Sequence, residues 1–209
     1  MFALTEEDVS GRILGCADGP ASFNTEATRR GARVVSADPL YRFDAAQIEE
    51  RITATAGQVL EQTRLNAHAY VWDSIRSVDE LETVRMEAMR EFLADYPDGR
   101  ARGRYVDAEL PRLPFADGSF DLALCSHFLF LYTAHLDGPF HEAAIREMCR
   151  VAADVRIFPL LTLDGQRSAY LDDSADALRR AGFGVSTERV RYEFQKGGNQ
   201  MLRVSHRQR

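Results

Sequence analysis

Cysteine is scarce in this chain, and no long uninterrupted apolar run is present. The three cysteines, Cys16, Cys125 and Cys149, are an odd number in apolar surroundings, and no CxxC or mixed Cys/His spacing is typical of a metal site. The sequence therefore excludes a disulfide scaffold, predicts no metal site and favours a reducing compartment. Residues 120–136 are the most apolar stretch, but they are shorter than the about 20 residues that span a bilayer and include one aspartate and two histidines.

Excess positive charge is absent as well. The 209 residues include 32 Asp and Glu against 26 Lys and Arg, which gives a net charge of −6. A net negative charge disfavours a general nucleic-acid coat, so we expect no nucleic-acid partner. The opening segment, MFALTEEDVSGR, carries acids where a secretory signal would carry basic and then apolar residues. We therefore expect a soluble cytoplasmic protein without membrane attachment.

The remaining composition is that of an ordinary globular protein, 45% hydrophobic and 28% charged. A chain of this length suits one domain, or one domain that carries a sizeable insertion. We interpret residues 1–209 as a single domain.

The first part of the chain alternates between strand and helix patterns. A short apolar run at 12–14 leads into a glycine-containing turn at 15–20, and a helical stretch follows at 21–30. The β-branched run 33–37 then ends at Asp38. Strand, turn, helix and strand in this order predict a βαβ unit, and such units build parallel sheets.

The alternation stops over residues 40–102, which we interpret as a helical insertion after the second strand. Capping motifs at Asp44 and Ser77 each open a helix, and an aromatic stretch at 68–72 lies between them. The second helix is expected to end at 96–99, where Tyr-Pro-Asp-Gly stands. The apolar positions at helical spacing are Ile48, Ile52, Val59 and Leu60 in the first helix and Leu81, Val84, Ala88, Met89 and Phe92 in the second.

The α/β pattern resumes after the insertion. Strands are expected at 103–107, 120–124 and 155–161, helices at 140–151 and 173–181, and two final β runs at 184–194 and 200–205. A hairpin-type loop at 195–199 separates the last two runs. The fold class is therefore α/β, a doubly wound and mostly parallel sheet.

Gly15, Gly19 and Asp38 form the first constellation with chemical meaning. Glycines after a first strand let the backbone approach a ligand, and a carboxylate about 20 residues later can accept both hydroxyls of a ribose. The turn reads G-C-A-D-G-P and no GxxxxGK[ST] occurs, which argues against phosphate as the main recognised group. The alternative is a tight turn followed by a strand-end acid with no ligand.

The segment ILGCADGPASFNTEATRRGARVVSADP resembles the first motifs of class I S-adenosylmethionine (SAM)-dependent methyltransferases. RYVDAELPRLPFADGSFDLALCSHFLFLY is similar to the region around the third and fourth strands of that family, and REMCRVAADVRIFPL to its next helix and fifth strand. The resemblance covers residues 1–38 and 103–207. It implies a seven-stranded sheet with an antiparallel C-terminal strand, and SAM as the cofactor.

The resemblance also implies roles for individual residues. The turn of Gly15, Cys16, Ala17 and Gly19 would pass beneath the methionine and ribose part of SAM. Asp38 would hold the ribose hydroxyls, and Leu40 or Tyr41 would flank the adenine. Asp107, with the backbone of Ala108, would accept the adenine amino group. Cys125, Ser126 and His127 would line the methyl end of the cofactor and the substrate entrance.

Two positions, one just before and one inside the glycine turn, depart from the family pattern. Ile13 stands where the family usually has an acid, and Ala17 replaces the second glycine. An alanine with positive φ would cost about 1 kcal/mol. These departures motivate a non-catalytic alternative, a protein that binds SAM or S-adenosylhomocysteine (SAH) on the same fold. A nicotinamide-dependent oxidoreductase would share the turn and the acid but would not explain the block DAELPRLPF.

Methyl transfer needs mainly in-line alignment and exclusion of water, because the sulfonium methyl is already activated. His127 is the candidate general base if the acceptor must lose a proton; otherwise it bonds to the backbone and shapes the pocket. Tyr70 and Trp72 in the insertion suggest a lid over the carboxyl edge of the sheet, although they would equally serve as the insertion's own core. No [DNS]PP[YFW] motif and no catalytic Pro-Cys pair are present, so exclusion favours a small-molecule acceptor, with the oligomeric state left open.

Overall fold

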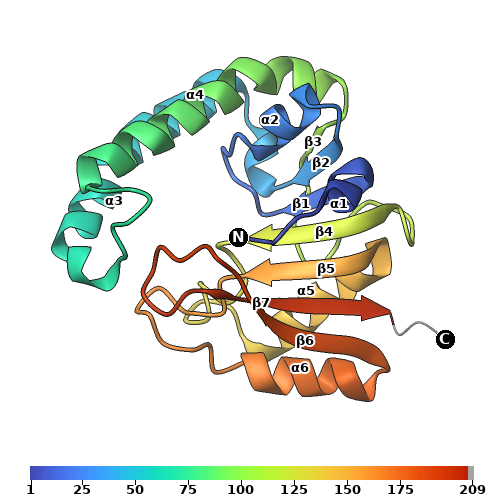
Figure 1. Ribbon diagram of the computed structural model, residues 1–209. Coiled ribbons are helices and arrows are strands. Elements are labelled where there is room, and N and C mark those ends of the chain that lie inside the picture. The colour runs from blue at the N-terminus through green and yellow to red at the C-terminus, as the bar shows by residue number, and fades with distance from the viewer. Residues whose placement is uncertain (207–209) are drawn as a thin grey trace.

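The computed structural model describes residues 1–206 and is built on a seven-stranded sheet (Figure 1). The strand order is β3-β2-β1-β4-β5-β7-β6. All neighbouring pairs up to β5 are parallel, whereas β7 is antiparallel to both β5 and β6. The predicted doubly wound sheet with one antiparallel C-terminal strand is therefore confirmed. The strands are β1 (Arg12–Cys16), β2 (Arg33–Ala37), β3 (Tyr105–Val106), β4 (Phe120–Ser126), β5 (Ala152–Phe158), β6 (Phe183–Arg189) and β7 (Gln200–His206).

Six α-helices and two short 3-10 helices connect or precede these strands within the described residues. They are α1 (Glu6–Ser10), α2 (Phe23–Arg29), η1 (Pro39–Arg42), α3 (Ala45–Leu65), η2 (Ala67–Ala69), α4 (Val78–Ala101), α5 (Gly138–Val151) and α6 (Leu171–Arg180). In the same part of the chain, no helix combines the length and the apolar character needed to cross a membrane.

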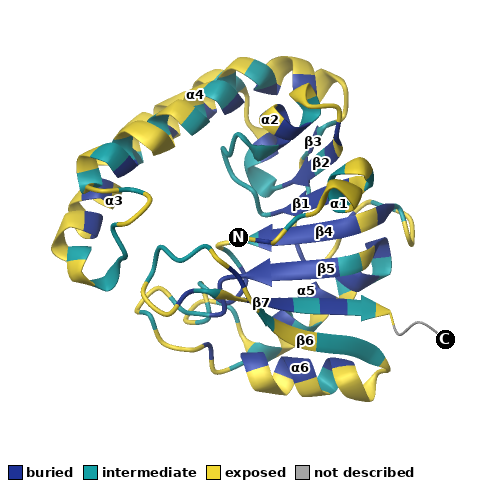
Figure 2. Ribbon diagram, viewed as in Figure 1, coloured by how far each residue is buried: buried dark blue, intermediate teal, exposed yellow. Residues whose placement is uncertain are grey.

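Both faces of the central strands are buried, as Figure 2 shows for β4 and β5. In β4, Leu122 and Leu124 belong to the apolar cluster under α2 and the N-terminal segment. Ala123 and Cys125 point the other way, into the larger cluster that includes residues of α5 and α6. A strand covered on both faces reads as a continuous apolar run, which is why the sequence pattern identified it.

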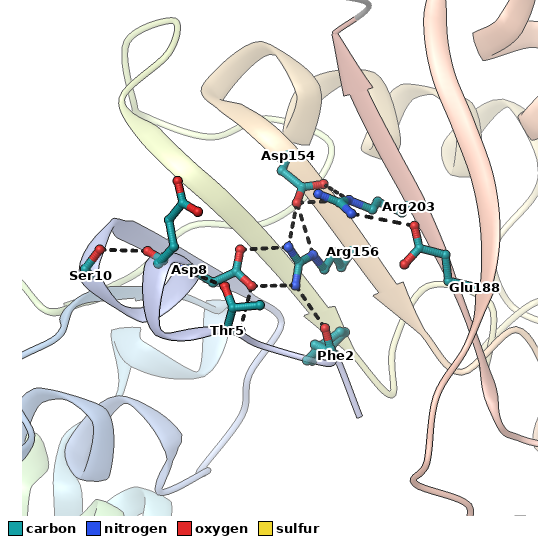
Figure 3. Close-up of polar contacts among 9 residues, drawn as sticks. Phe2, Thr5, Asp8, Ser10, Asp154, Arg156, Glu188 and Arg203 are labelled. Atoms are coloured by element: carbon teal, nitrogen blue, oxygen red, sulfur yellow. Dashed lines mark hydrogen bonds and ion pairs between the residues drawn. The ribbon is translucent and has the colours of Figure 1, made fainter.

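The N-terminal segment is fixed to the sheet by a buried arginine (Figure 3). Arg156 of β5 is only 5% exposed and donates to both carboxylate oxygens of Asp8, at 2.8 and 3.0 Å. It also donates to Asp154 and to the carbonyl of Phe2. Asp154 in turn accepts from Arg203 of β7. One network therefore joins α1 to two adjacent strands.

The insertion consists of the two long helices α3 and α4, which begin where the capping motifs predict. Asp44 accepts from the backbone N–H of Gln47, and Ser77 accepts from that of Glu80. At their base the helices share a third apolar cluster made of Tyr41, Ile48, Ile52, Phe92, Tyr96 and Tyr105. From there they extend past the carboxyl ends of β4 and β5 (Figure 1).

The predicted end of the second insertion helix is wrong, because α4 continues through Pro97 to Ala101. A proline inside a helix removes one backbone hydrogen bond. Tertiary contacts of the neighbouring residues hold this last turn. Tyr96 is 1% exposed and its hydroxyl donates to the carbonyls of Tyr41 and Phe43.

The apolar positions expected to be packed in the insertion are only partly buried. Ile48, Ile52, Leu81 and Phe92 are buried as predicted, but Val59 is 39% and Val84 is 45% exposed. Leu60 and Leu81, at the far ends of the two helices, are buried as well, so the exposed apolar residues lie between two packed regions.

The linker between α3 and α4 contacts the loop that precedes β7. Val71 donates its backbone N–H to the carbonyl of Phe194 at 2.7 Å, and Lys196 donates to that of Ala69 at 2.9 Å. The rings of Tyr70 and Phe194 stack with their centroids 4.8 Å apart. The insertion therefore forms an arch that starts beside β2 and contacts the β6–β7 loop at its other end. We call this contact between the linker and the loop the landing site.

The loop at the landing site shows that the predicted boundary of the final hairpin is wrong. The run 184–194 was expected to be one strand, but β6 ends at Arg189 and residues 190–199 form the connecting loop. Two backbone bonds join this loop to the insertion, through partners more than 100 residues away in sequence.

Candidate functional site

The turn after β1 has the geometry of a close backbone approach. Ala17 and Gly19 have φ of +57° and +59°, and the Ala17 N–H donates to the carbonyl of Ala37 at 2.8 Å. A Cβ placed on Gly19 would meet no atom within 4 Å, so this side of the turn is open. At Gly15 a Cβ would lie 1.8 Å from the carboxylate of Asp18, so only glycine fits beneath that side chain.

Asp18 is a site residue that the sequence reasoning missed. Its carboxylate folds back over Gly15 and accepts a hydrogen bond from the hydroxyl of Ser36 at 2.6 Å. Burial raises the pKa of Asp18 to about 6; the Ser36 hydrogen bond opposes this rise and the nearby charge of Asp38 adds to it. The available signal was an acid placed inside the glycine turn itself.

Asp38 joins the glycine turn to the start of η1. One carboxylate oxygen accepts from the N–H of Gly19 at 2.9 Å and the other from the N–H of Leu40 at 2.7 Å. Burial raises the pKa of this carboxyl, and the two backbone donors act against the rise. Each oxygen has a second lone pair, so the side chain can still accept hydroxyl protons from a ligand.

The structure separates the two residues expected beside the adenine. Tyr41 is 1% exposed, packs its ring among Phe92, Tyr96 and Tyr105, and donates its hydroxyl to the carbonyl of Gly19 at 2.9 Å. Its ring supports the turn from inside the core and is not available to stack on a base. Leu40 is half-buried and keeps part of its side chain accessible.

Asp107 and Ala108 follow β3, next to the end of β2. The backbone N–H of Asp38 donates to the carbonyl of Val106 at 3.2 Å, which holds the two segments together. The carboxylate of Asp107 lies 3.5 Å from the guanidinium of Arg42, and both side chains are about half exposed. Asp107 therefore lies at an open rim, close enough for its charge to raise the pKa of Asp38.

Cys16 and Cys125 face each other across β1 and β4, and both are fully buried in the apolar core. Burial raises the pKa of Cys125 to about 12 and that of Cys16 well above its ordinary value. Neither thiol is exposed to a ligand or ionised at neutral pH. The side chains of these two predicted site residues serve the core, and only their backbone reaches the sheet edge.

Ser126 and His127 stand at the end of β4, beside the end of β5. His127 has a φ of +52° and donates its backbone N–H to the carbonyl of Phe158 at 2.7 Å. Its Nδ1 lies 2.9 Å from the hydroxyl of Ser126. The imidazole keeps an exposed edge, but loss of water around it lowers its pKa, and the positive charge of Arg85 on α4 lowers it further. The imidazole is therefore mostly neutral at pH 7.

The predicted site residues thus gather at one edge of the sheet, where β1, β2, β3 and β4 end. Three carboxylates lie in or near the glycine turn: Asp18 within it, Asp38 bonded to it, and Asp107 close to Asp38. Such a set suits a nucleoside that carries positive charge and would repel a phosphate. Within residues 1–206 no group of three or more His, Cys, Asp or Glu side chains is arranged to hold a metal ion.

Known proteins resemble this chain both in sequence and in fold. A protein-family model described as a methyltransferase domain matches residues 56–154. The uncharacterized protein MJ0045 of Methanocaldococcus jannaschii is 32% identical over 203 residues, which is 97% of this chain and 89% of that protein.

Two solved structures share the fold at low sequence identity. One is the O-methyltransferase NcsB1 from neocarzinostatin biosynthesis, solved in complex with SAM and 2-hydroxy-5-methyl naphthoic acid. Its TM-score is 0.52 at 10% sequence identity, and the match covers 98% of this chain and 51% of that chain. The other is magnesium protoporphyrin IX methyltransferase from Synechocystis PCC 6803 with bound SAH, with a TM-score of 0.50, 14% identity, and coverage of 94% and 74%.

Proposed function

The chain belongs to the class I SAM-dependent methyltransferases, and on this premise we propose that it binds SAM at the glycine turn and transfers the methyl group to a small-molecule acceptor. The observation that carries the proposal is the set of three carboxylates at the sheet edge, next to a glycine turn that leaves room for a ligand. Gly19 leaves free space, and Asp38 still has hydrogen-bonding capacity beside it. The positively charged sulfonium and ammonium groups of SAM suit the surrounding carboxylates.

Each residue at the sheet edge binds a different part of SAM. Asp38 accepts the ribose hydroxyls, Asp107 with the backbone of Ala108 accepts the adenine amino group, and Leu40 flanks the adenine. The turn from Gly15 to Gly19, with Cys16 and Ala17 contributing backbone only, passes beneath the rest of the molecule. These assignments rest on the placement of the residues at the ends of β1, β2 and β3.

When bound, SAM supplies an activated methyl group: the acceptor atom bonds to the methyl carbon while the carbon–sulfur bond breaks and its electron pair stays on the sulfur of SAH. The chain contributes alignment and exclusion of water, and the arch of α3 and α4 covers the carboxyl edge for this purpose. His127 takes the acceptor's proton at Nε2, because Nδ1 is engaged with Ser126.

A protein that binds SAM or SAH without transferring the methyl group is the alternative. Ile13 favours it, because the position where relatives carry an acid is here fully buried in the core. Incubation with methyl-labelled SAM and a metabolite extract distinguishes the two proposals. Label in an extract component supports methyl transfer, and its absence from a protein that binds SAH tightly supports the alternative.

The Asp38→Ala variant tests the binding site. Charge-assisted hydrogen bonds to a carboxylate contribute about 1.5–3 kcal/mol each, so SAH affinity should fall by about ten- to several-hundredfold in titration calorimetry. The melting temperature should fall as well, because Asp38 also accepts from the N–H groups of Gly19 and Leu40.

Asp173→Ala is the matched control, since this exposed acid lies on α6, far from the turn in sequence and in the sheet order. It should leave SAH affinity unchanged. Wild-type affinity in Asp38→Ala would refute the role of Asp38, and no binding of SAM or SAH to the wild type at millimolar concentration would refute the proposed function.

A further inference from the structure

The arch contains an apolar cavity of about 210 Å³ between α3 and α4. Pro20 and Leu40 line the cavity, and they lie one residue after Gly19 and two residues after Asp38 in the chain. This part of the cavity therefore lies beside the proposed cofactor site. Its walls are mainly the side chains of Ile48, Ile52, Val59, Leu60, Met86 and Met89.

The fold packs only part of this apolar surface: Ile48 and Ile52 are buried in the third apolar cluster, but their side of the cavity is left unfilled. Protein interiors normally fill such spaces at the density of organic crystals, and an unfilled cavity costs stability. Yet Val59, which the sequence pattern places in a core, is 39% exposed on the cavity wall. Apolar side chains that line an accessible cavity next to a reaction site are the usual lining of a small-molecule pocket.

Positive charge lies on the same lining. Arg51 of α3 and Arg85 of α4 both line the cavity, together with one acid, Glu82. Among residues 1–206 neither arginine has an ion-pair partner or a side-chain hydrogen bond. The charge of Arg85 also lowers the pKa of His127, so Arg85 lies within charge range of the end of β4.

We infer that this cavity is the acceptor subsite, and that it takes a small anionic acceptor with an apolar body of about one ring, whose negative group pairs with Arg85 and Arg51. The inference rests on the proposed function. The size follows from comparison: an apolar cavity of about 150 Å³ holds one benzene, and this one is about 210 Å³. The anionic class follows from two unpaired arginines against one acid in an otherwise apolar lining.

The test measures binding of four simple probes to the SAH-loaded protein by titration calorimetry and ligand-observed NMR. Benzoate and phenyl phosphate carry both the ring and the charge, benzyl alcohol lacks the charge, and acetate lacks the ring. We expect either ring anion to bind at least about fivefold more tightly than benzyl alcohol and about tenfold more tightly than acetate. Whichever of benzoate and phenyl phosphate binds more tightly identifies the anionic group.

Two matched pairs of variants locate the probe. Ala56 lines the cavity and Ala54, two residues earlier on α3, is exposed and does not. Ala56→Trp fills the cavity and should weaken benzoate binding more than about tenfold, whereas Ala54→Trp should change it less than about twofold. Arg85→Gln should weaken benzoate about fivefold or more, and Arg90→Gln, on the same helix but outside the lining, should not.

SAH affinity is the internal control, and it should stay within about twofold of wild type in all four variants. Absence of binding by all four probes, equal binding of benzyl alcohol and benzoate, or unchanged benzoate affinity in Ala56→Trp would each overturn the inference. Failure of the wild-type protein to bind SAH would instead overturn the proposed function, so the two failures are distinguishable.

Discussion

At the scale of single residues, the two carboxylates at the glycine turn, Asp18 within it and Asp38 at the end of β2, are held in different ways. Asp38 receives two backbone N–H donors, one on each oxygen, whereas Asp18 receives one hydroxyl and lies beside Asp38. The charged form of Asp18 is therefore poorly compensated, and its pKa rises to about 6. A carboxylate whose charge is unfavourable in the folded protein, at an edge suited to a cationic ligand, is consistent with a binding role.

Asp18 makes the stability of the protein depend on pH in a direction unusual for an acid. Because the folded pKa of about 6 lies above the ordinary value of 3.8, the folded state binds more protons in this window, and stability is lost as pH rises from about 4 to 6. Asp18→Asn keeps the acceptor for Ser36 and removes the charge, so it should be about 1–3 kcal/mol more stable than wild type at pH 8. Urea unfolding at pH 4, 6 and 8 measures this.

The gain from Asp18→Asn should disappear at pH 4, where Asp18 is largely protonated in the folded protein. Asp173→Asn, which changes an exposed acid on α6, should show no such pH-dependent gain. An Asp18→Asn variant no more stable than wild type at pH 8 would mean that the carboxylate is solvated in the free protein.

At the scale of elements, the arch depends on a few contacts at its landing site. Tyr70 stacks on Phe194, and Trp72 meets the same ring edge-on with centroids 5.5 Å apart. The indole N–H of Trp72 donates to the carbonyl of Ala67, which fixes the linker itself. Trp72 therefore belongs both to the linker's own packing and to its contact with the 190–199 loop.

Phe194→Ala should loosen the landing site without unfolding the domain. Two aromatic pairs are lost, each contributing about 0.5–1.5 kcal/mol, so amide exchange over residues 66–72 should accelerate by about tenfold or more. Hydrogen-exchange mass spectrometry measures this, with Phe43→Ala as the control because Phe43 is 44% exposed at the base of the insertion.

The same exchange measurement tests whether the arch covers bound ligands. Saturating SAH together with a ring anion should slow exchange over 62–76 in the wild type. Unchanged exchange in that segment would contradict the covering role and leave α3 and α4 as a fixed support.

At the scale of the whole molecule, Arg156 connects parts of the chain that are far apart in sequence. It pairs with Asp8 of the N-terminal helix and Asp154 of β5, and Asp154 also pairs with Arg203 of β7 (Figure 3). Although burial raises the pKa of Asp8, hydrogen bonds from Arg156 and Thr5 hold it below its ordinary value. The N-terminal segment thus becomes part of the domain through charge pairing as well as through Phe2 in the core.

Arg156→Met should destabilise the protein by about 3–5 kcal/mol, because it leaves the largely buried carboxylate of Asp8 without its ion-pair partner and leaves Asp154 with Arg203 alone. Arg12→Met removes the exposed ion pair with Asp121 and should cost less than about 1 kcal/mol. Urea unfolding at pH 7 compares the two. The loss in Arg156→Met should shrink as pH falls below 4, since the stabilisation of Asp8 is present above its unfolded pKa and is lost on protonation.

Equal destabilisation by the two arginine variants would show that the buried network contributes no more than a surface pair. In that case the apolar contacts of Phe2 would hold the N-terminal segment by themselves.

The sequence by itself determined the order of strands and helices, the starts of α3 and α4, and the position of Asp38 at the end of β2. These features are local. Apolar periodicity, a cap three residues from its partner, and the spacing from Gly19 to Asp38 are all set by neighbours along the chain. The resemblance added the antiparallel strand β7 and the methyltransferase family.

Only the tertiary structure decided how Pro97, Tyr41, Asp18 and the 190–199 loop behave. Tyr96 keeps α4 helical through Pro97 by bonding to carbonyls more than 50 residues away, and the loop finds its backbone partners in the insertion. The pKa of Asp18 is raised because β2 and the turn exclude water from its carboxylate. Desolvation and long-range packing depend on residues that are distant in sequence, so no local pattern encodes them.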